Sequence, residues 1–291
     1  MKPGVYPAAV TPFDAKGAID LVAVARLMAW FKAANCAGVV VAGTNGEGPS
    51  LSAVEKRDLI KGAVGLADGL EVLLGVSTPS LDEAKWLCKQ AHHAGAHAVL
   101  LMPPGFFRDA GDSGIAGWFE AVLDSSPLPI VVYNFPQRTG ITLPPETMAR
   151  LCRHERMMGL KDSSGRAENM PQYASALEGS GKSLFVGDET LLLHALSHGW
   201  TGTISGAANV LPRWLSQIVA EWATDRESAE TKFALIGPAL AAIRTSPQPA
   251  ANKQILFELG VLPSPDVRLP LELSASERVQ DALAEVRRLV R

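Results

Sequence analysis

The segment MMGLKDSSG, residues 157–165, holds a short apolar run that closes on a lysine. The run has the length of a strand, and the small polar residues and glycine after it mark a turn. A lysine that closes a buried strand is not an ordinary solvated charge, because burial disfavours the ammonium form. We therefore expect Lys161 to carry a neutral amine, the nucleophile that Schiff-base chemistry on a ketone requires. The alternative is a lysine that leaves the strand end and reaches water.

The same unit, an apolar run followed by a helical pattern, recurs along the chain. Helical spacing of apolar residues between the runs predicts seven helices. Each run is apolar throughout and does not alternate with polar residues, which is typical of parallel strands buried on both faces. Eight such units predict the α/β class and a closed (β/α)8 TIM barrel. The expected strands are residues 4–10, 38–42, 71–75, 97–102, 129–133, 157–160, 183–186 and 201–205.

The alternation ends after Asn209, and the remainder reads as helices without strands between them. We expect a barrel over residues 1–222 and a C-terminal helical extension, residues 223–291, packed on it. The helices expected in this part are residues 211–222, 226–243, 253–259 and 274–290.

Composition excludes several classes of partner. A formal net charge of −3 and a pI near 6.1 give no support for a nucleic-acid or polybasic membrane surface. We find neither a signal peptide nor an apolar run of the roughly 18 residues that a membrane span needs. Three cysteines without metal-ligand spacing favour a reduced, cytoplasmic compartment. His194 and His198 are four residues apart on one predicted helix, but no third ligand accompanies them, so we expect neither a metal nor a cofactor.

Polar residues gather where the predicted strands end, which is where active sites of such barrels lie. The glycine-rich turn after the second strand could bind a carboxylate through its backbone N–H groups, or be an ordinary turn. Tyr133 could move a proton or be a buried core tyrosine, and Arg138 could clamp a carboxylate or be solvated. The candidate site residues are Gly43, Thr44, Asn45, Gly46, Tyr133, Arg138, Lys161, Asp188, Glu189 and Ser205.

With these motifs the chain resembles the dihydrodipicolinate synthase / N-acetylneuraminate lyase superfamily of class I pyruvate aldolases. The resemblance covers nearly the whole chain and lies in four motifs that occur in order, Gly43-Thr44-x-Gly46-Glu47, Tyr133-Asn134-x-Pro136, Arg138-Thr139-Gly140 and Gly159-x-Lys161-Asp162. It implies a Schiff base on Lys161, proton transfer by Tyr133 assisted by Thr44, and a pyruvate carboxylate held by Thr44 and the N–H of Asn45. It also implies a homo-oligomer, a tetramer or a dimer.

Two positions differ from the synthase that joins pyruvate to aspartate semialdehyde. Asn45 stands where that enzyme usually has threonine, and Phe107 stands where it has a tyrosine that comes from a neighbouring subunit and completes a hydroxyl relay. Asp188, Glu189 and Ser205 resemble positions by which the sialic-acid lyase grips a polyol, although a similar acidic pair occurs in the synthase.

Three functions follow as expectations. The first is an aldolase or dehydratase acting on a 2-keto-3-deoxy sugar acid, which makes or cleaves a bond next to pyruvate. The second is 4-hydroxy-tetrahydrodipicolinate synthase, because Arg138 matches the residue that holds the semialdehyde carboxylate. The third, from another class, is a non-catalytic protein that binds a 2-keto acid.

Overall fold

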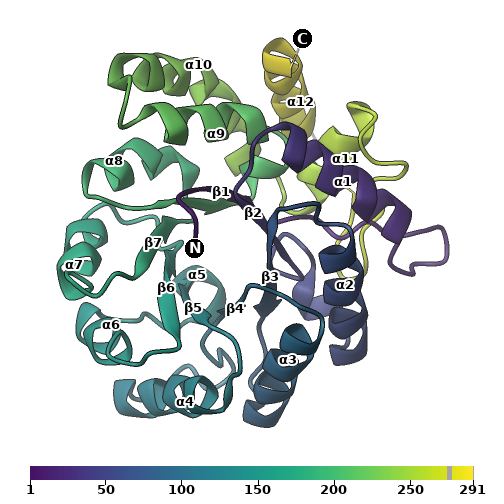
Figure 1. Cartoon of the computed structure of the whole chain (residues 1–291). Coiled ribbons are helices and arrows are strands. Elements are labelled where there is room, and N and C mark those ends of the chain that lie inside the picture. The colour runs from purple at the N-terminus through teal and green to yellow at the C-terminus, as the bar shows by residue number, and fades with distance from the viewer. Residues whose placement is uncertain (274–276, 291) are drawn as a thin grey trace.

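The computed structural model describes residues 1–273 and 277–290, and its centre is a ring of eight parallel strands (Figure 1). The strands pair in the order β1-β8-β7-β6-β5-β4-β3-β2. The TIM barrel expected from the sequence is therefore confirmed. The strands are β1 Gly4–Pro7, β2 Gly38–Val41, β3 Glu71–Val76, β4 Ala98–Leu101, β5 Ile130–Asn134, β6 Met157–Asp162, β7 Ser183–Val186 and β8 Gly202–Ser205.

The ring closes between its first two strands. The N–H of Ala37 donates to the carbonyl of Val5 at 3.0 Å, and the N–H of Ala9 donates to the carbonyl of Val40 at 2.9 Å. β1 ends at Pro7, three residues before the expected end at Val10. The contact with β2 continues beyond Pro7 through Ala9, and the N–H of Val10 then donates to the side-chain oxygen of Asn209 at 3.0 Å, which ties the first segment to the end of the barrel.

Strand side chains alternate between two cores because successive residues of a strand point to opposite faces. On β5, Val131 and Tyr133 point into the barrel, where they join Tyr6, Phe185 and Ile204. Ile130 and Val132 of the same strand point outward and pack in the larger core under the helices. This alternation brings Tyr133 to the inside of the ring.

Helices surround the barrel (Figure 1), and capping side chains fix several of their starts. Ser52 and Glu55 form a reciprocal capping box at the start of α2, and the side chains of Asp20 and Ser80 cap α1 and α3. The helices are α1 Leu21–Ala33, α2 Ala53–Gly65, α3 Leu81–His93, α4 Asp112–Ser125, α5 Pro136–Thr139, α6 Pro145–Leu151, α7 Asn169–Ala176, α8 Leu192–Ser197 and α9 Pro212–Glu221, with short 3-10 turns η1 Gly48–Ser50, η2 Glu189–Leu191 and η3 Ala207–Asn209.

The C-terminal part is helical, as expected, and consists of α10 Arg226–Thr245, α11 Ala250–Glu258 and α12 Glu277–Val290. The first three residues of the helix expected from 274 lie outside the described residues. α11 lies close to η3 at the end of the barrel, so the extension reaches the rim where the strands end. The domain boundary near residue 222 stays a prediction. Within the described ranges, no helix is both long and apolar enough to cross a bilayer.

Candidate active site

Lys161 and Tyr133 lie side by side on neighbouring strands. They are register partners of β6 and β5, and the Nζ atom of Lys161 lies 4.1 Å from the centre of the Tyr133 ring. Both residues are buried, with 4% and 3% of their surfaces exposed. Lys161 is the penultimate residue of its strand, as the sequence indicated, and its amine is shielded from bulk water. This is the environment in which a lysine can serve as a nucleophile.

Gly187, directly after β7, makes room for this lysine. A Cβ atom at Gly187 would lie 1.8 Å from the Oγ atom of Ser163 and 2.9 Å from the Cε atom of Lys161. Both distances are far below van der Waals contact, so any larger residue at Gly187 would displace the side chains of Ser163 and Lys161. The Oγ atom of Ser163, pressed against Gly187, lies 3.3 Å from the hydroxyl oxygen of Tyr133.

The glycine-rich turn lies at the end of β2 and is held from two sides. A Cβ atom at Gly75 of β3 would lie 2.7 Å from the Cα atom of Gly43, so the two backbones approach closely. The hydroxyl of Thr11 donates to the carbonyl of Gly46 at 2.6 Å. In the described part of the chain, the backbone N–H groups of Thr44 and Asn45 donate to no other group. Two free adjacent N–H groups are what a carboxylate-binding nest offers.

Glu47 closes this turn and is fully enclosed. It has a left-handed backbone conformation with φ of 54°. Its carboxylate receives the ammonium of Lys253 from α11 at 2.5 Å and the backbone N–H of Arg268 at 2.9 Å. Neither side chain of the Glu47–Lys253 pair has solvent contact. Burial lowers the pKa of Lys253, and the negative charge of Glu47 opposes that change.

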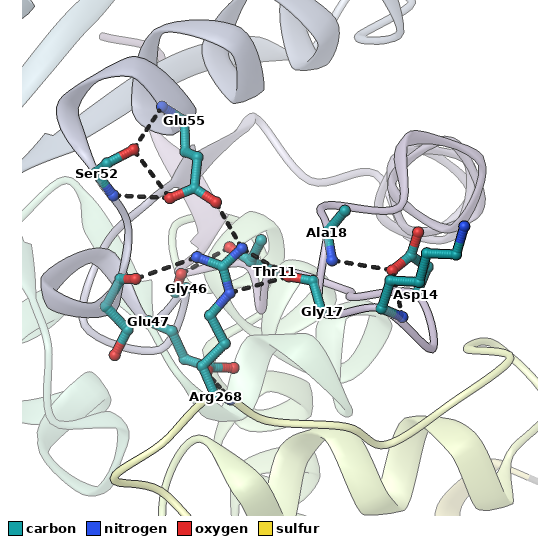
Figure 2. A network of polar contacts seen from close by, with 11 residues as sticks. Thr11, Asp14, Gly17, Ala18, Gly46, Glu47, Ser52, Glu55 and Arg268 are labelled. Carbon is teal, nitrogen blue, oxygen red and sulfur yellow. Dashed lines mark hydrogen bonds and ion pairs between the residues drawn. The ribbon is translucent and has the colours of Figure 1, made fainter.

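Arg268 links the turn at Glu47 to the neighbouring loops of the barrel (Figure 2). Its guanidinium donates to the carbonyls of Gly17 and Ser50, at 2.7 Å and 3.2 Å, and to the carboxylate of Glu55 at 2.5 Å. The hydrogen bond from Arg268 lowers the pKa of Glu55 to about 2, because it stabilises the charged form of the carboxylate. The C-terminal extension therefore fixes the loop that carries the nest.

A cavity of about 300 Å³ opens over the strand ends. Seven of the ten candidate residues border it, and so do Ser163 and Arg244, which the sequence did not single out. Gly43 borders a smaller adjoining space with Thr44 and Tyr133. The seven are Thr44, Asn45, Tyr133, Arg138, Lys161, Asp188 and Glu189.

The acidic residues of the rim are engaged within the protein. One oxygen of Asp188 pairs with Arg244 of α10 at 2.6 Å, and the other accepts the hydroxyl of Thr190 at 2.6 Å. Glu189 accepts the N–H of Ala207 at 2.8 Å.

Ser205 is fully buried, and its hydroxyl accepts the N–H of Ala208 at 3.1 Å. Gly46 lies where a Cβ atom would come within 2.8 Å of the Ala9 carbonyl. The substrate contacts expected of Ser205, Asp188 and Glu189 stay predictions. The hydrogen bonds that these residues make do stabilise the ends of β7 and β8.

Asp162, the last residue of β6, holds the end of the strand that carries Lys161. It accepts hydrogen bonds from the side chains of Asn134 and Ser164, each at 2.7 Å, and is almost completely buried. Burial raises its pKa, although the two hydrogen bonds oppose this. The bond from Asn134 to Asp162 joins β5 to β6, and a second bond from Asn134 to the hydroxyl of Tyr173, at 3.2 Å, joins β5 to α7.

Ser163 is not among the candidate site residues, although its spacing from Lys161 carries a signal. It follows Lys161 by two residues, and residues two apart in a strand share a face. The signal for Lys253 and Arg268 was weaker, because they come from segments far from the turn that they support. Arg244 lies on a helix whose orientation toward the rim only the fold defines.

The fold and the rim define the class of the protein: a (β/α)8 barrel with a buried lysine, a tyrosine and a turn with two free backbone N–H groups at its carboxyl end, as in lysine-dependent lyases. The model of the Dihydrodipicolinate synthetase family matches residues 1–288. The chain belongs to this family, and it is a lyase that works through a lysine Schiff base.

Known proteins of this family are similar over almost their entire length. The chain is 37% identical to 4-hydroxy-tetrahydrodipicolinate synthase of Hyphomonas neptunium, covering 96% of each chain, and 33% identical to that of Methanosarcina barkeri, covering 98% of each. Among solved structures, dihydrodipicolinate synthase of Thermotoga maritima gives a TM-score of 0.94 at 27% identity, over 99% of this chain and 98% of that one. The synthase of Acinetobacter baumannii in complex with pyruvate gives 0.92 at 28%, with the same coverage.

Proposed function

We propose that this chain is a 4-hydroxy-tetrahydrodipicolinate synthase, which condenses pyruvate with aspartate semialdehyde. The curated relatives that bear this name support the proposal, since they align end to end with the chain. The observation that carries it is Arg138, which borders the cavity and has no acidic partner within the described residues, whereas Arg244 is paired with Asp188. A guanidinium without an acidic partner favours an aldehyde that carries a carboxylate.

The first half of the reaction uses residues at the strand ends. The amine of Lys161 attacks the ketone carbon of pyruvate and passes one of its protons to the ketone oxygen, while the turn at Thr44 and Asn45 holds the carboxylate. The hydroxyl of the adduct then leaves as water with the proton of Tyr133, and an iminium forms. The resulting tyrosinate removes a proton from C3 of pyruvate. The C–H electron pair becomes the carbon–carbon double bond, and the C=N pair returns to the lysine nitrogen as an enamine.

The enamine is the nucleophile for the second half. Its C3 carbon attacks the aldehyde carbon, Tyr133 gives its proton to the aldehyde oxygen, and the nitrogen pair of the enamine re-forms the iminium. The amino group of the semialdehyde then attacks the iminium carbon, closes the ring, returns a proton to Tyr133 and releases Lys161 as an amine. Arg138 binds the carboxylate of the aldehyde, which brings the aldehyde carbon toward the enamine. Positioning of this kind is a major source of rate enhancement in bond-forming reactions.

A second candidate is an aldolase or dehydratase for a 2-keto-3-deoxy sugar acid. Phe107 favours it, since this residue is 63% exposed and has no hydroxyl for the relay that the synthase uses. Asn45 favours it as well, because an amide replaces a hydroxyl beside the nest. Against it, Asp188 and Glu189, which would grip the hydroxyl groups of a sugar chain, are engaged by Arg244 and by a backbone N–H.

Turnover of the two substrate classes by one preparation separates these candidates. We expect activity with pyruvate plus aspartate semialdehyde, and much weaker cleavage of 2-keto-3-deoxygluconate. Arg138→Met should raise the KM for the semialdehyde by roughly 10- to 100-fold, since a charge-assisted bond contributes about 1.5–3 kcal/mol. Its KM for pyruvate should change little. Faster turnover of the sugar acid than of the semialdehyde would overturn the proposal.

We also propose that the chain forms a homo-oligomer. Phe106 and Phe107 support this, because they form an exposed edge-to-face pair with ring centres 5.2 Å apart and leave a large apolar surface uncovered. Light scattering across a concentration series tests it. A mass equal to one chain at every concentration would refute it. The cytoplasmic location inferred from the cysteines stays a prediction.

A further inference from the structure

The hydroxyl of Tyr133 has one partner in the described part of the chain, and this partner is Ser163. The Oγ atom of Ser163 donates to the tyrosine oxygen at 3.3 Å. Both side chains border the cavity, together with Lys161. The hydrogen bond between Ser163 and Tyr133 therefore lies beside the lysine amine that forms the imine.

The position of Ser163 is strongly constrained. Its N–H donates to the carbonyl of Asn134 at 2.9 Å, which holds its backbone against β5. Its Oγ atom occupies space that the absent Cβ atom of Gly187 leaves free, since such an atom would lie 1.8 Å away. Phe107, at the position where the synthase has a tyrosine, has no hydroxyl that could bond to Tyr133.

We infer that Ser163 is a positioning residue that stabilises Tyr133 while the tyrosine is deprotonated during imine and enamine formation. The inference rests on the lysine Schiff base and is independent of the second substrate. Between loss of water and removal of the C3 proton, Tyr133 is an anion. A hydroxyl that donates to this oxygen stabilises it at that moment, since hydrogen bonds to charged groups are the stronger ones.

Protons and electrons balance without a net contribution from Ser163. Tyr133 gives one proton to the leaving hydroxyl and regains one from C3 of pyruvate. Ser163 keeps its own proton and donates the same hydrogen bond before, during and after the step. The bond speeds the reaction because it is stronger to the charged form of Tyr133 than to the neutral form.

The test uses the full chain and pyruvate alone. Exchange of the C3 protons of pyruvate in deuterium oxide, followed by NMR, reports the proton transfer, and borohydride trapping reports the imine. Ser163→Ala should trap pyruvate at Lys161 to the same extent, with an unchanged half-saturating pyruvate concentration. Its maximal exchange rate should fall by about 10- to 100-fold, the loss expected for one charge-assisted hydrogen bond.

Two further variants separate hydrogen bonding from packing. Ser163→Thr keeps the hydroxyl and should restore exchange to within a few-fold of the unmodified chain. Ser197→Ala, on the outer helix α8, removes an exposed serine hydroxyl and should leave both readings unchanged. Full exchange in Ser163→Ala would overturn the inference, and so would an equal loss in the alanine and threonine variants. These outcomes leave the proposed second substrate untouched, because aspartate semialdehyde is absent.

Discussion

Replacing Lys253 by methionine should destabilise the protein substantially. Methionine keeps the length of the buried side chain but removes its charge. Glu47 would then be enclosed with one oxygen unpaired and only the N–H of Arg268, at 2.9 Å, on the other. Breaking a buried ion pair from one side typically costs about 3–5 kcal/mol, because an uncompensated charge remains. The carbonyl of Asp266, which accepts from Lys253 at 2.6 Å, would also lose its donor.

Thermal unfolding followed by circular dichroism, at one fixed protein concentration, measures this effect. At about 2 °C per kcal/mol for a chain of this size, Lys253→Met should lower Tm by about 6–10 °C. The loop that Glu47 ends carries the nest, so the half-saturating pyruvate concentration in the exchange assay should rise as well. The imine should still be trapped at saturating pyruvate.

The matched control is the double variant Glu47→Gln with Lys253→Met. Glutamine keeps an acceptor for the N–H of Arg268 but buries no charge, so at least half of the lost stability should return. A single variant within about 2 °C of the unmodified chain would refute the reasoning, given that slope. A double variant no more stable than the single one would show that packing of the lysine stem, and not the unpaired charge, is responsible.

Two further perturbations have defined outcomes. Gly187→Ala places a Cβ atom 1.8 Å from the Oγ atom of Ser163 and 2.9 Å from the Cε atom of Lys161, so pyruvate exchange should fall by roughly 100-fold or more, as expected for a displacement of about 1 Å. Glu55→Gln removes the charge paired with Arg268 but keeps the capping box. Because the folded pKa of Glu55 is about 2 and its ordinary value is 4.5, the charge stabilises the fold above pH 4.5, and this contribution disappears as the pH falls toward 2. The Tm of Glu55→Gln should therefore lie below that of the unmodified chain at neutral pH, and the gap should close between these values.

Each of these two predictions has an outcome that would contradict it. Gly237→Ala is the control for the glycine, since a Cβ atom there meets nothing within 4 Å and the site is on α10, away from the lysine. It should retain full exchange activity, whereas full activity in Gly187→Ala would disprove the steric argument. For Glu55, a Tm gap that stays constant from neutral pH to pH 2 would mean that its charge contributes nothing.

The barrel was readable from the sequence because its units are local. Apolar runs of strand length and helical spacing depend on neighbours a few residues apart, and the side chains that cap α1, α2 and α3 act over equally short distances in the sequence. Lys161 was readable for the same reason, since its place at the end of an apolar run is a property of the segment itself. The class of enzyme followed from that lysine and from motifs of fixed local spacing.

The ends of the strands and the partners of the acidic rim residues were harder to predict from the sequence. β1 is shorter than expected, and the N–H of Val10 beyond it donates to Asn209, which comes from the other end of the barrel sequence. Asp188 was interpreted as a group that binds a sugar chain, and the structure pairs it with Arg244 of α10. That pair shifts our proposal from a sugar acid to an aldehyde with a carboxylate. Neither contact leaves a periodic trace, because loops and helix faces meet only after folding.

The sequence alone determined that eight buried strands alternate with helices and that one of them ends on a lysine, because hydrophobic period and turn chemistry are properties of short segments. Only the tertiary structure decided how the nest is held and how the rim is charged. Glu47 meets Lys253 and Arg268 across more than two hundred residues, and the identity of such partners depends on where the folded loops bring their charges together.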